Sequence, residues 1–312
     1  MVAKTRFGII GGGAVGGLYG CLLAKVGFDV HFLLRSDADH VRQHGWKIET
    51  PLGDFQLAGT KVHVSADTMP PCDYTVIALK TTQNRMLQEL LPAPTSEGGR
   101  VLVLQNGLDV ERDAAAIVGS DRVLGGCCFL CSNKVGPGHI RHLDQGRILV
   151  GDYSRAGGQV SQHASMLCDE LVMAGIDAKV TADLGTTRWK KLMWNIPFNG
   201  LSVVLDASTR DLMDNDESCA LARSLMIEVH QAAAACNSII DEKAIETTLD
   251  VTRKMVPYDS SMRLDYLNHR PMELEAIFDK PIRSAEQHGF DMPQVRMLYQ
   301  ALLFLNAQRS KP

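Results

Sequence analysis

The chain has 312 residues, of which 45% are hydrophobic and 22% charged, and its formal net charge is −4. This length fits two domains of ordinary size better than one core. The mildly acidic balance argues against nucleic acid as a partner. No apolar run reaches the roughly 18 residues of a membrane span, and no apolar h-region is expected before the first strand, which starts almost at Met1.

The eight cysteines are scattered through apparent strands and helices, as reduced core thiols would be. Cys127, Cys128 and Cys131 lie close together, but no second Cys or His pair follows at ligand spacing, so we expect no metal site. The composition therefore indicates a cytoplasmic protein that binds neither nucleic acid nor a membrane.

A glycine-rich turn follows the first expected strand, Val2–Ile10, and precedes an expected helix, Leu18–Val26. In this pattern Gly11 allows a tight turn, Gly13 allows close approach of the backbone to a pyrophosphate, and Gly16 allows the helix to pack on the strand. The N–H groups at the helix N-terminus then face the phosphates. The sequence predicts a dinucleotide site formed by Gly11, Gly12, Gly13, Ala14, Val15 and Gly16.

The second expected strand, Asp29–Leu34, ends at Arg35. NAD enzymes carry an acidic residue roughly 20 residues past the glycines, whereas an arginine there accommodates a 2′-phosphate. Arg35 therefore favours NADPH/NADP+ as the cofactor. Asp37 and Asp39 follow closely and leave an NAD-type contact open.

The remainder of the first half alternates between strands and turns. Short segments at Lys47–Glu49, Phe55–Leu57 and Lys61–Val64 suggest a small β insertion, and apolar runs at Tyr74–Leu79 and Val101–Leu104 suggest buried strands that end in polar residues. Residues Gly125–Val150 suggest a hairpin, with turn signals at Gly136–Gly138 and Asp144–Gly146. A helix, Val160–Ala174, and a strand, Ala178–Thr181, follow.

From about Thr186 the pattern is helical without a clear strand. Helices are expected at Arg188–Leu205, Glu217–Asn237, Glu242–Met255, Met272–His288 and Pro293–Ala307, the last with Asp291 as its N-cap. We predict an α/β fold class, in which an N-terminal Rossmann-type dinucleotide-binding domain (residues 1–185) is followed by an all-α domain (residues 186–312). The expected site is the crevice between them.

One stripe of the first of these helices carries an ammonium and two amides. Lys191, Asn195 and Asn199 stand at positions i, i+4 and i+8 among large apolar residues. Carbonyl reduction needs a proton donor and fixed hydrogen-bond donors for the substrate, and a lysine with two amides supplies both. The alternative is that the asparagines cap loops and Lys191 is solvated.

Two further positions have open interpretations. Ser261 either donates a hydrogen bond to a substrate carboxylate or caps the helix that follows it. Glu273 lies on an expected helix, where a glutamate is ordinary.

These features resemble the ketopantoate reductase family, the NADPH-dependent 2-dehydropantoate 2-reductases, and the resemblance extends over essentially the whole chain. The matching motifs, in order, are Gly11–Gly16, Arg35, Ala78-Leu79-Lys80, Gln105-Asn106-Gly107, Lys191-Leu192-x-x-Asn195-x-x-x-Asn199, and Ser260-Ser261-Met262 with Glu273. The resemblance implies reduction of ketopantoate to (R)-pantoate in pantothenate and coenzyme A biosynthesis.

By the same resemblance, Lys191 is the general acid, and Asn195, Asn199 and Ser261 hold the substrate. The glycine turn, Arg35, Lys80, Asn106 and Glu273 serve the cofactor, with Asn106 and Glu273 also bordering the substrate.

Two departures from the family pattern bear on the substrate. Pro197 lies between the two asparagines and removes a backbone hydrogen bond. Thr209 stands where the family often places another substrate asparagine.

Alternative functions stay open at this point. One is a reductase or dehydrogenase of another 2-oxo or 3-hydroxy acid, and another is a non-catalytic NADP(H)-binding sensor, which would not need an acid such as Lys191. The expected partner is a small 2-oxo acid, and a homodimer is left open.

Overall fold

The computed structural model describes residues 4–154, 159–257 and 259–309, so the expected start of the first strand at Val2 lies outside the described residues. The chain divides into two compact units, one of Met1–Gln105 with Val110–Leu184 and one of Asn106–Asp109 with Gly185–Pro312. The second unit thus includes a four-residue loop, 106–109, that lies within the first domain as predicted from the sequence (residues 1–185).

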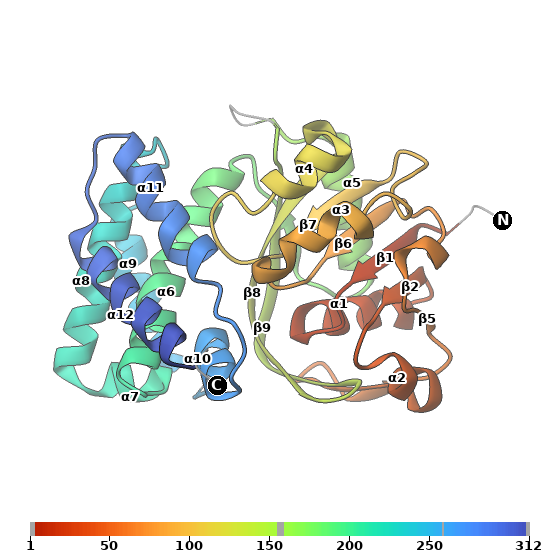
Figure 1. Cartoon of the computed structure of the whole chain (residues 1–312), viewed down its shortest axis with the longest axis horizontal. Helices are drawn as coiled ribbons and strands as arrows, with labels where there is room; N and C mark the ends of the chain where they lie inside the picture. Colours follow the sequence, from red (N-terminus) through yellow and green to blue (C-terminus); the bar gives the residue numbers. More distant parts are fainter. Residues whose placement is uncertain (1–3, 155–158, 258, 310–312) are drawn as a thin grey trace. The chain divides into compact units, whose positions relative to one another are not determined.

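The first unit is built on one mixed sheet (Figure 1). Six parallel strands run in the order β5-β2-β1-β6-β7-β8, which is the order of a doubly wound Rossmann fold. Their bounds are β1 Arg6–Ile10, β2 Asp29–Leu33, β5 Lys61–His63, β6 Tyr74–Ile77, β7 Arg100–Val103 and β8 Val123–Gly136. The expected dinucleotide-binding fold is confirmed.

The sheet continues beyond β8 through four more strands. β9 (His139–Asp152) pairs antiparallel with β8 and parallel with both β3 (Trp46–Glu49) and β10 (Ala178–Val180), and β4 (Phe55–Leu57) closes the edge. The expectation of a small β insertion is therefore wrong. β3 and β4 extend one edge of the main sheet, whereas β5 joins the other edge beside β2. Short alternating segments do not reveal which distant strand they pair with, because that choice is made by tertiary packing.

The expected hairpin is present, but one of its two turn signals is a bulge. Pro137 and Gly138 connect β8 to β9, whereas Gln145 and Gly146 lie inside β9 with φ angles of 61° and 124°. The pairing register shifts there. His142 Nε2 lies 3.1 Å from the Asp144 carbonyl oxygen and 3.0 Å from the Gln145 carbonyl oxygen, so the histidine ring contacts the backbone of the bulge. A residue with positive φ suits a bulge as well as a turn, which explains the error.

Helices of the first unit connect these strands. They are α1 Ala14–Lys25, α2 Ala38–His44, α3 Leu87–Leu90, α4 Arg112–Val118 and α5 Gln162–Met173, with 3₁₀ turns η1 Ala66–Thr68, η2 Thr81–Met86 and η3 Ser120–Arg122. None of α2, α3 and α4 is predicted from the sequence, because each helix is too short for a clear helical period. The core of this unit includes the fully buried rings of Phe7, Phe32 and Trp46.

In its described residues the second unit consists of helices and connecting segments without a strand (Figure 1). Its helices are α6 Leu184–Val204, α7 Thr209–Asp214, α8 Asp216–Ala235, α9 Lys243–Lys254, α10 Ser261–Leu267, α11 Lys280–Gln287 and α12 Pro293–Arg309. α8 packs against α7, α9, α11 and α12, around a core that includes Phe198 and Phe278. The short helices α7 and α10 were not anticipated from the sequence.

Two details of this unit differ from expectation. The predicted continuous helix Met272–His288 contains a π-helix, η4 (Glu275–Asp279), followed by α11. The predicted cap of α12 is also corrected. The first-turn amides of Gln294 and Val295 donate to the buried carboxylate of Glu228 at 3.0 and 2.7 Å, whereas Asp291 accepts from the Met292 amide and from the Arg296 guanidinium. A carboxylate at a helix N-terminus is stabilised by these donors and by the helix dipole.

Candidate active site

In the glycine turn of the first unit, the backbone conformation at Gly11 and the close packing at Gly11 and Gly16 require glycine. Gly11 has a φ of 105°, and a Cβ there would lie 3.0 Å from the backbone of Ala78, at the point where the sheet order reverses between β1 and β6. A Cβ on Gly16 would lie 2.1 Å from the carbonyl oxygen of Gly11, so only glycine lets α1 approach this closely.

The turn has room for a ligand in front of Gly13. A Cβ at this position would meet no atom within 4 Å. Gly13 is the N-cap of α1, no side chain caps the helix, and its first turn holds no acidic residue. Gly12 packs beneath Leu34, and Ala14 and Val15 open α1. The N–H groups of this helix end therefore suit a pyrophosphate, and the residues present fit a dinucleotide.

Three charged residues follow β2, and they differ in exposure. Arg35 is exposed. The carboxylate of Asp37 is buried and accepts hydrogen bonds from Lys134 Nζ at 2.6 Å and from the Gly138 amide at 3.0 Å. Asp39 is exposed and pairs with Arg42 on its own helix.

At the carboxyl ends of β6 and β7, Lys80 and Gln105 stand on neighbouring strand extensions. Lys80 is half-buried at the start of η2. The buried Gln105 donates to the Leu79 carbonyl at 3.1 Å and to Asn84 Oδ1 at 2.7 Å, which ties the two strand ends together. Gln105 belongs to one of the matching motifs, but the sequence predicts no role for it. A buried polar residue at the end of an apolar strand was the available signal.

The helix stripe of the second unit is largely buried. On α6, Asn195 and Asn199 are 4% and 1% exposed, and Lys191 is half-buried. α6 continues through Pro197, although the proline nitrogen cannot donate to the Met193 carbonyl. The alternative in which the asparagines cap loops is excluded, because both lie in the middle of the helix.

Lys191 meets Asn106 from a distant part of the chain. Its Nζ donates to Asn106 Oδ1 at 2.5 Å. Since Asn106 belongs to the loop that follows β7, the pair joins residues 85 positions apart within one unit. The structure therefore brings these two expected site residues together.

The loop that carries Asn106 is attached to the π-helix. Gly107 has a φ of 118°, and a Cβ there would lie 2.5 Å from the Ala276 carbonyl oxygen. The Leu108 amide donates to that same oxygen at 2.9 Å, and Lys280 Nζ donates to the Asp109 carbonyl at 2.9 Å. A π-helix often marks a functional site, and this one provides the surface on which the loop rests.

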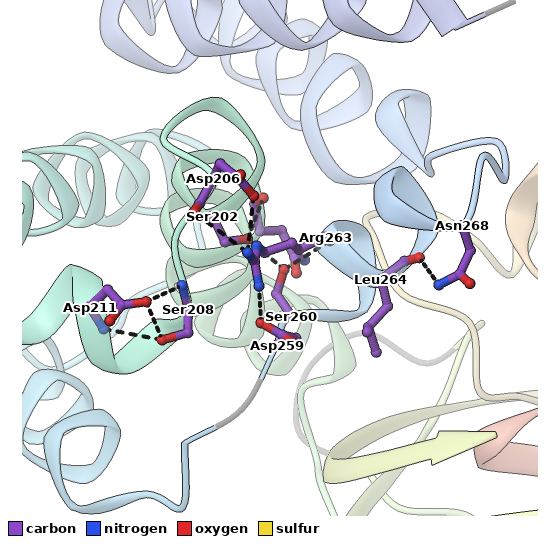
Figure 2. Close-up of polar contacts among 10 residues, drawn as sticks. Ser202, Asp206, Ser208, Asp211, Asp259, Ser260, Arg263, Leu264 and Asn268 are labelled. Atoms are coloured by element: carbon purple, nitrogen blue, oxygen red, sulfur yellow. Dashed lines mark hydrogen bonds and ion pairs between the residues drawn. The ribbon is translucent and has the colours of Figure 1, made fainter. Parts of the chain in front are cut away.

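Asn199 combines a buried side-chain amide with a backbone carbonyl that accepts a hydrogen bond from a serine hydroxyl. Within the described part of the chain its Oδ1 has no hydrogen-bond partner. Its backbone carbonyl accepts from Ser202 Oγ at 3.1 Å, and Ser202 Oγ lies 2.6 Å from Ser260 Oγ (Figure 2). A buried polar atom without a partner is costly, so it indicates a place for a ligand or water.

The start of α10 is organised by Ser260. Its side chain is the N-cap and accepts from the Arg263 amide at 3.1 Å, which leaves Ser261 as the first helical residue. Of the two alternatives for Ser261, capping is therefore excluded.

Arg263 fastens this helix start to the end of α6. Its guanidinium donates to Asp259 and, at 3.0 Å, to Asp206 Oδ1 (Figure 2). Asp206 follows α6 with a φ of 46°, a backbone conformation in which aspartate is tolerated. Arg263 is not predicted from the sequence, because an arginine in a polar segment gives no signal of its partners.

The two remaining candidates are buried. Thr209 is 2% exposed and begins α7, behind the Ser208 N-cap whose capping box with Asp211 is visible in Figure 2. Glu273 is 4% exposed and directly precedes the helical residues that lead into η4, so the expectation of an ordinary helix glutamate is wrong. A glutamate buried to this degree is uncommon, which makes Glu273 a stronger candidate than its sequence context suggested.

Comparisons with known proteins cover both units. The family model described as "Ketopantoate reductase PanE/ApbA" matches residues 7–155, and the model of its C-terminal part matches residues 183–306. A 2-dehydropantoate 2-reductase of Nostoc sp. is 45% identical over 307 residues, which are 98% of this chain and 96% of the relative.

Solved structures give the same result. A 2-dehydropantoate 2-reductase from Geobacter metallireducens GS-15 is 37% identical, with a TM-score of 0.92 over 98% of this chain and 100% of the other. One from Methylococcus capsulatus is 31% identical, with a TM-score of 0.85 over 98% of both chains. A D-mandelate dehydrogenase solved with NADH and anilino(oxo)acetate shares the fold, with a TM-score of 0.87 over 98% of this chain and 99% of the other at 19% identity. The chain therefore belongs to the ketopantoate reductase family, oxidoreductases of the 2-dehydropantoate 2-reductase type.

Proposed function

We propose that the protein reduces 2-dehydropantoate to (R)-pantoate with NADPH, and that Lys191 donates the proton. The observation that carries this proposal is the hydrogen bond from Lys191 Nζ to Asn106 Oδ1. Lys191 lies on the same face of α6 as the buried Asn195 and Asn199. An oriented ammonium beside buried amides is what a carbonyl oxygen needs as it gains negative charge. A sensor without catalytic activity would not require it.

When bound, NADPH supplies a hydride to the carbonyl carbon of the substrate. Lys191 holds its proton against the carbonyl oxygen, and the amide oxygen of Asn106 fixes the direction of the ammonium. Asn106 is itself held through the backbone contacts of its loop to Ala276 and Lys280. Positioning of this kind contributes to rate because the reacting groups do not have to be ordered during the reaction.

The other polar residues are assigned to substrate recognition. Asn195, Asn199 and Ser261 are proposed to hold the substrate, and the partnerless Oδ1 of Asn199 is available to accept a hydrogen bond from it. Glu273 is proposed as an acceptor for the terminal hydroxyl that ketopantoate carries. A site built to pair a hydroxyl rejects analogues that lack it.

The cofactor is proposed to be NADPH, held by the turn Gly11–Gly16 with Arg35 and Lys80. The exposed guanidinium of Arg35 suits a 2′-phosphate. The acids that could have favoured NAD are engaged elsewhere, Asp37 with Lys134 and Asp39 with Arg42. All eight cysteines are free thiols, which supports a proposed location in the reducing cytosol.

A second candidate substrate class is favoured by Thr209. Its hydroxyl is shorter than the asparagine often found there in the family, and a fold neighbour, D-mandelate dehydrogenase, was solved with a different 2-oxo acid analogue. The second candidate is thus reduction of another 2-oxo acid at the same site.

One assay separates these candidates. NADPH oxidation is followed with ketopantoate, 2-oxoisovalerate and phenylglyoxylate, and ketopantoate is expected to have the highest kcat/KM. The variant Glu273→Ala should reduce the discrimination against 2-oxoisovalerate, which lacks the hydroxyl. Equal rates with ketopantoate and 2-oxoisovalerate would overturn the ketopantoate assignment, and no turnover with any 2-oxo acid would favour the sensor.

A further inference from the structure

Asp37 occupies the position where the nucleotide-binding fold offers a choice of cofactor. It follows β2 roughly 20 residues after the glycine turn, where NAD enzymes place a carboxylate for the ribose hydroxyls. Yet the preceding Arg35 is exposed and Asp37 is buried. The two residues are separated by a single position and point into different environments.

Three donors hold the Asp37 carboxylate inward. Lys134 Nζ lies 2.6 Å and Ser36 Oγ 3.0 Å from Oδ1, while the Gly138 amide lies 3.0 Å from Oδ2. Burial by itself acts to raise the pKa of Asp37, but the hydrogen bonds from Lys134 and Gly138 outweigh it and place the pKa below its ordinary value. The carboxylate is therefore charged and matched by one cation, Lys134.

The hairpin that supplies these donors is packed against the segment it holds. Lys134 lies near the end of β8, and Gly138 forms the turn to β9 with a φ of 60°. A Cβ on Gly138 would lie 2.9 Å from the Gly45 carbonyl oxygen, at the end of α2, and 3.1 Å from Val41 Cγ2. The hairpin tip therefore packs against α2, which directly follows the segment that carries Arg35 and Asp37.

Without Lys134 this arrangement loses its balance of charge. A buried carboxylate without a counter-ion is strongly unfavourable, so Asp37 would turn toward solvent or toward Arg35. Either outcome weakens the binding of a 2′-phosphate. A carboxylate turned toward solvent repels the phosphate, and a carboxylate turned toward Arg35 neutralises the guanidinium that would bind it. The turned-out carboxylate would also be free to accept from ribose hydroxyls.

We propose that Lys134 is a specificity-determining residue for the dinucleotide, because it holds Asp37 inward and leaves the positive charge of Arg35 available to a 2′-phosphate. This inference rests on the proposed use of NADPH. Lys134 comes from the hairpin, 97 residues from Asp37 in sequence, so the residues that surround the glycine turn do not by themselves determine the choice.

The test measures binding in the absence of turnover. Calorimetry gives the dissociation constants of 2′,5′-ADP and of ADP for the wild-type protein and for Lys134→Met, Lys134→Arg, Asp37→Asn and the double variant Lys134→Met/Asp37→Asn. Lys134→Met should lower the preference for 2′,5′-ADP by about tenfold or more, the size expected when a charge-assisted contact is lost. Lys134→Arg should keep the preference, and so should Asp37→Asn.

The double variant separates charge from structure. Replacing Asp37 with asparagine removes the repulsive charge, so it should restore most of the preference lost in Lys134→Met. Thermal melting of each variant shows that it is folded at the temperature of the titration. Should Lys134→Met prove unfolded, Lys134→Gln takes its place, and the same expectations apply.

Two failures are distinguishable. A wild-type protein that binds ADP at least as tightly as 2′,5′-ADP overturns the NADPH proposal, and this inference with it. A wild-type protein that prefers 2′,5′-ADP, together with an unchanged preference in Lys134→Met or no rescue in the double variant, overturns the inference alone.

Discussion

The two units present their candidate residues in different ways. In the first unit, the glycine turn is a contiguous stretch in which backbone conformation makes the site, through the φ of Gly11 and the open space at Gly13. In the second unit, the site is made of side chains from separate segments, with Lys191 on α6, Asn106 on a loop and Glu273 before η4.

This difference suits the two units to different proposed roles, cofactor binding in the first unit and proton donation in the second. A backbone cradle can bind phosphates but has no proton to give, whereas the converging side chains of the second unit include an ammonium. Substitutions in the first unit should therefore alter cofactor affinity, and substitutions in the second should alter turnover. The following predictions test that division.

The largest effect is expected for Lys191→Ala. General acid catalysis typically contributes about 10²–10⁴-fold, so kcat should fall by that factor while the dissociation constant of NADPH stays nearly constant. Steady-state kinetics and a fluorescence titration with NADPH measure the two quantities. The control is Lys190→Ala, which removes an exposed lysine one position away and should leave both unchanged. If Lys191→Ala keeps most of its turnover at saturating substrate, the proton comes from another group.

A substitution of Gly107 should disturb the Asn106 loop itself. In Gly107→Ala the new Cβ would clash with the Ala276 carbonyl at a φ of 118°, which should cost about 2–4 kcal/mol and lower kcat. The matched control is Gly119→Ala, where φ is 88° but nothing lies within 4 Å, so only about 1–2 kcal/mol of backbone strain is expected. Urea unfolding and kcat are measured for both variants. Equal destabilisation of the two variants, with kcat unaffected, would contradict the role of the loop.

The same contrast explains what the sequence could predict. The strand order around β1 and the glycine turn follow from local rules, so Gly11, Gly13 and Gly16 were predicted together with their reasons. The stripe of Lys191, Asn195 and Asn199 was also predictable, because helical period places them on one face.

Contacts made over long sequence distances could not be predicted. Nothing local shows that Asn106 meets Lys191, that Glu228 caps α12, or that Asp37 is held by Lys134. The boundaries of the longer helices agree with the prediction within a few residues, except at the π-helix after Glu273, whereas the short helices α2, α3, α4, α7 and α10 were not predicted. Tertiary packing made these choices, and a single sequence does not record them.

A smaller effect is expected for Arg35→Ala, which tests the first unit. Loss of a charge-assisted hydrogen bond to a 2′-phosphate is worth roughly 1.5–3 kcal/mol, so KM for NADPH should rise about ten- to a hundredfold. The KM for NADH and kcat with NADPH should change little. Arg253→Ala, an exposed arginine paired with Asp250 in the second unit, serves as the control. An equal rise in KM for both dinucleotides would mean that Arg35 does not contact the 2′-phosphate.

The smallest effect concerns the pH dependence of the first unit's stability. His31 is buried on β2, where its Nδ1 lies 2.9 Å from His63 Nε2 and its Nε2 lies 3.2 Å from Asp29. Burial is the main cause that lowers the pKa of His31 to about 4, with Lys61, His63 and Arg6 acting in the same direction and Asp29 opposing them. Burial also lowers the pKa of His63, so neither ring favours a proton in the folded state.

The sign of the effect follows from proton linkage. The unfolded chain takes up a proton on His31 near its ordinary pKa of 6.5, but the folded chain does so only near pH 4. Stability should therefore be independent of this group above pH 6.5 and should fall as the pH decreases from 6.5 toward 4. In urea unfolding at pH 7 and pH 5, His31→Gln should reduce the loss between the two pH values by about 1–2 kcal/mol relative to the wild type. His44→Gln, which replaces an exposed histidine on α2, should reproduce the wild-type loss. An identical loss of unfolding free energy in His31→Gln and the wild type would show that His31 is not the group that titrates. A loss confined to the unfolding of the second unit would place the pH sensitivity outside the sheet of the first unit.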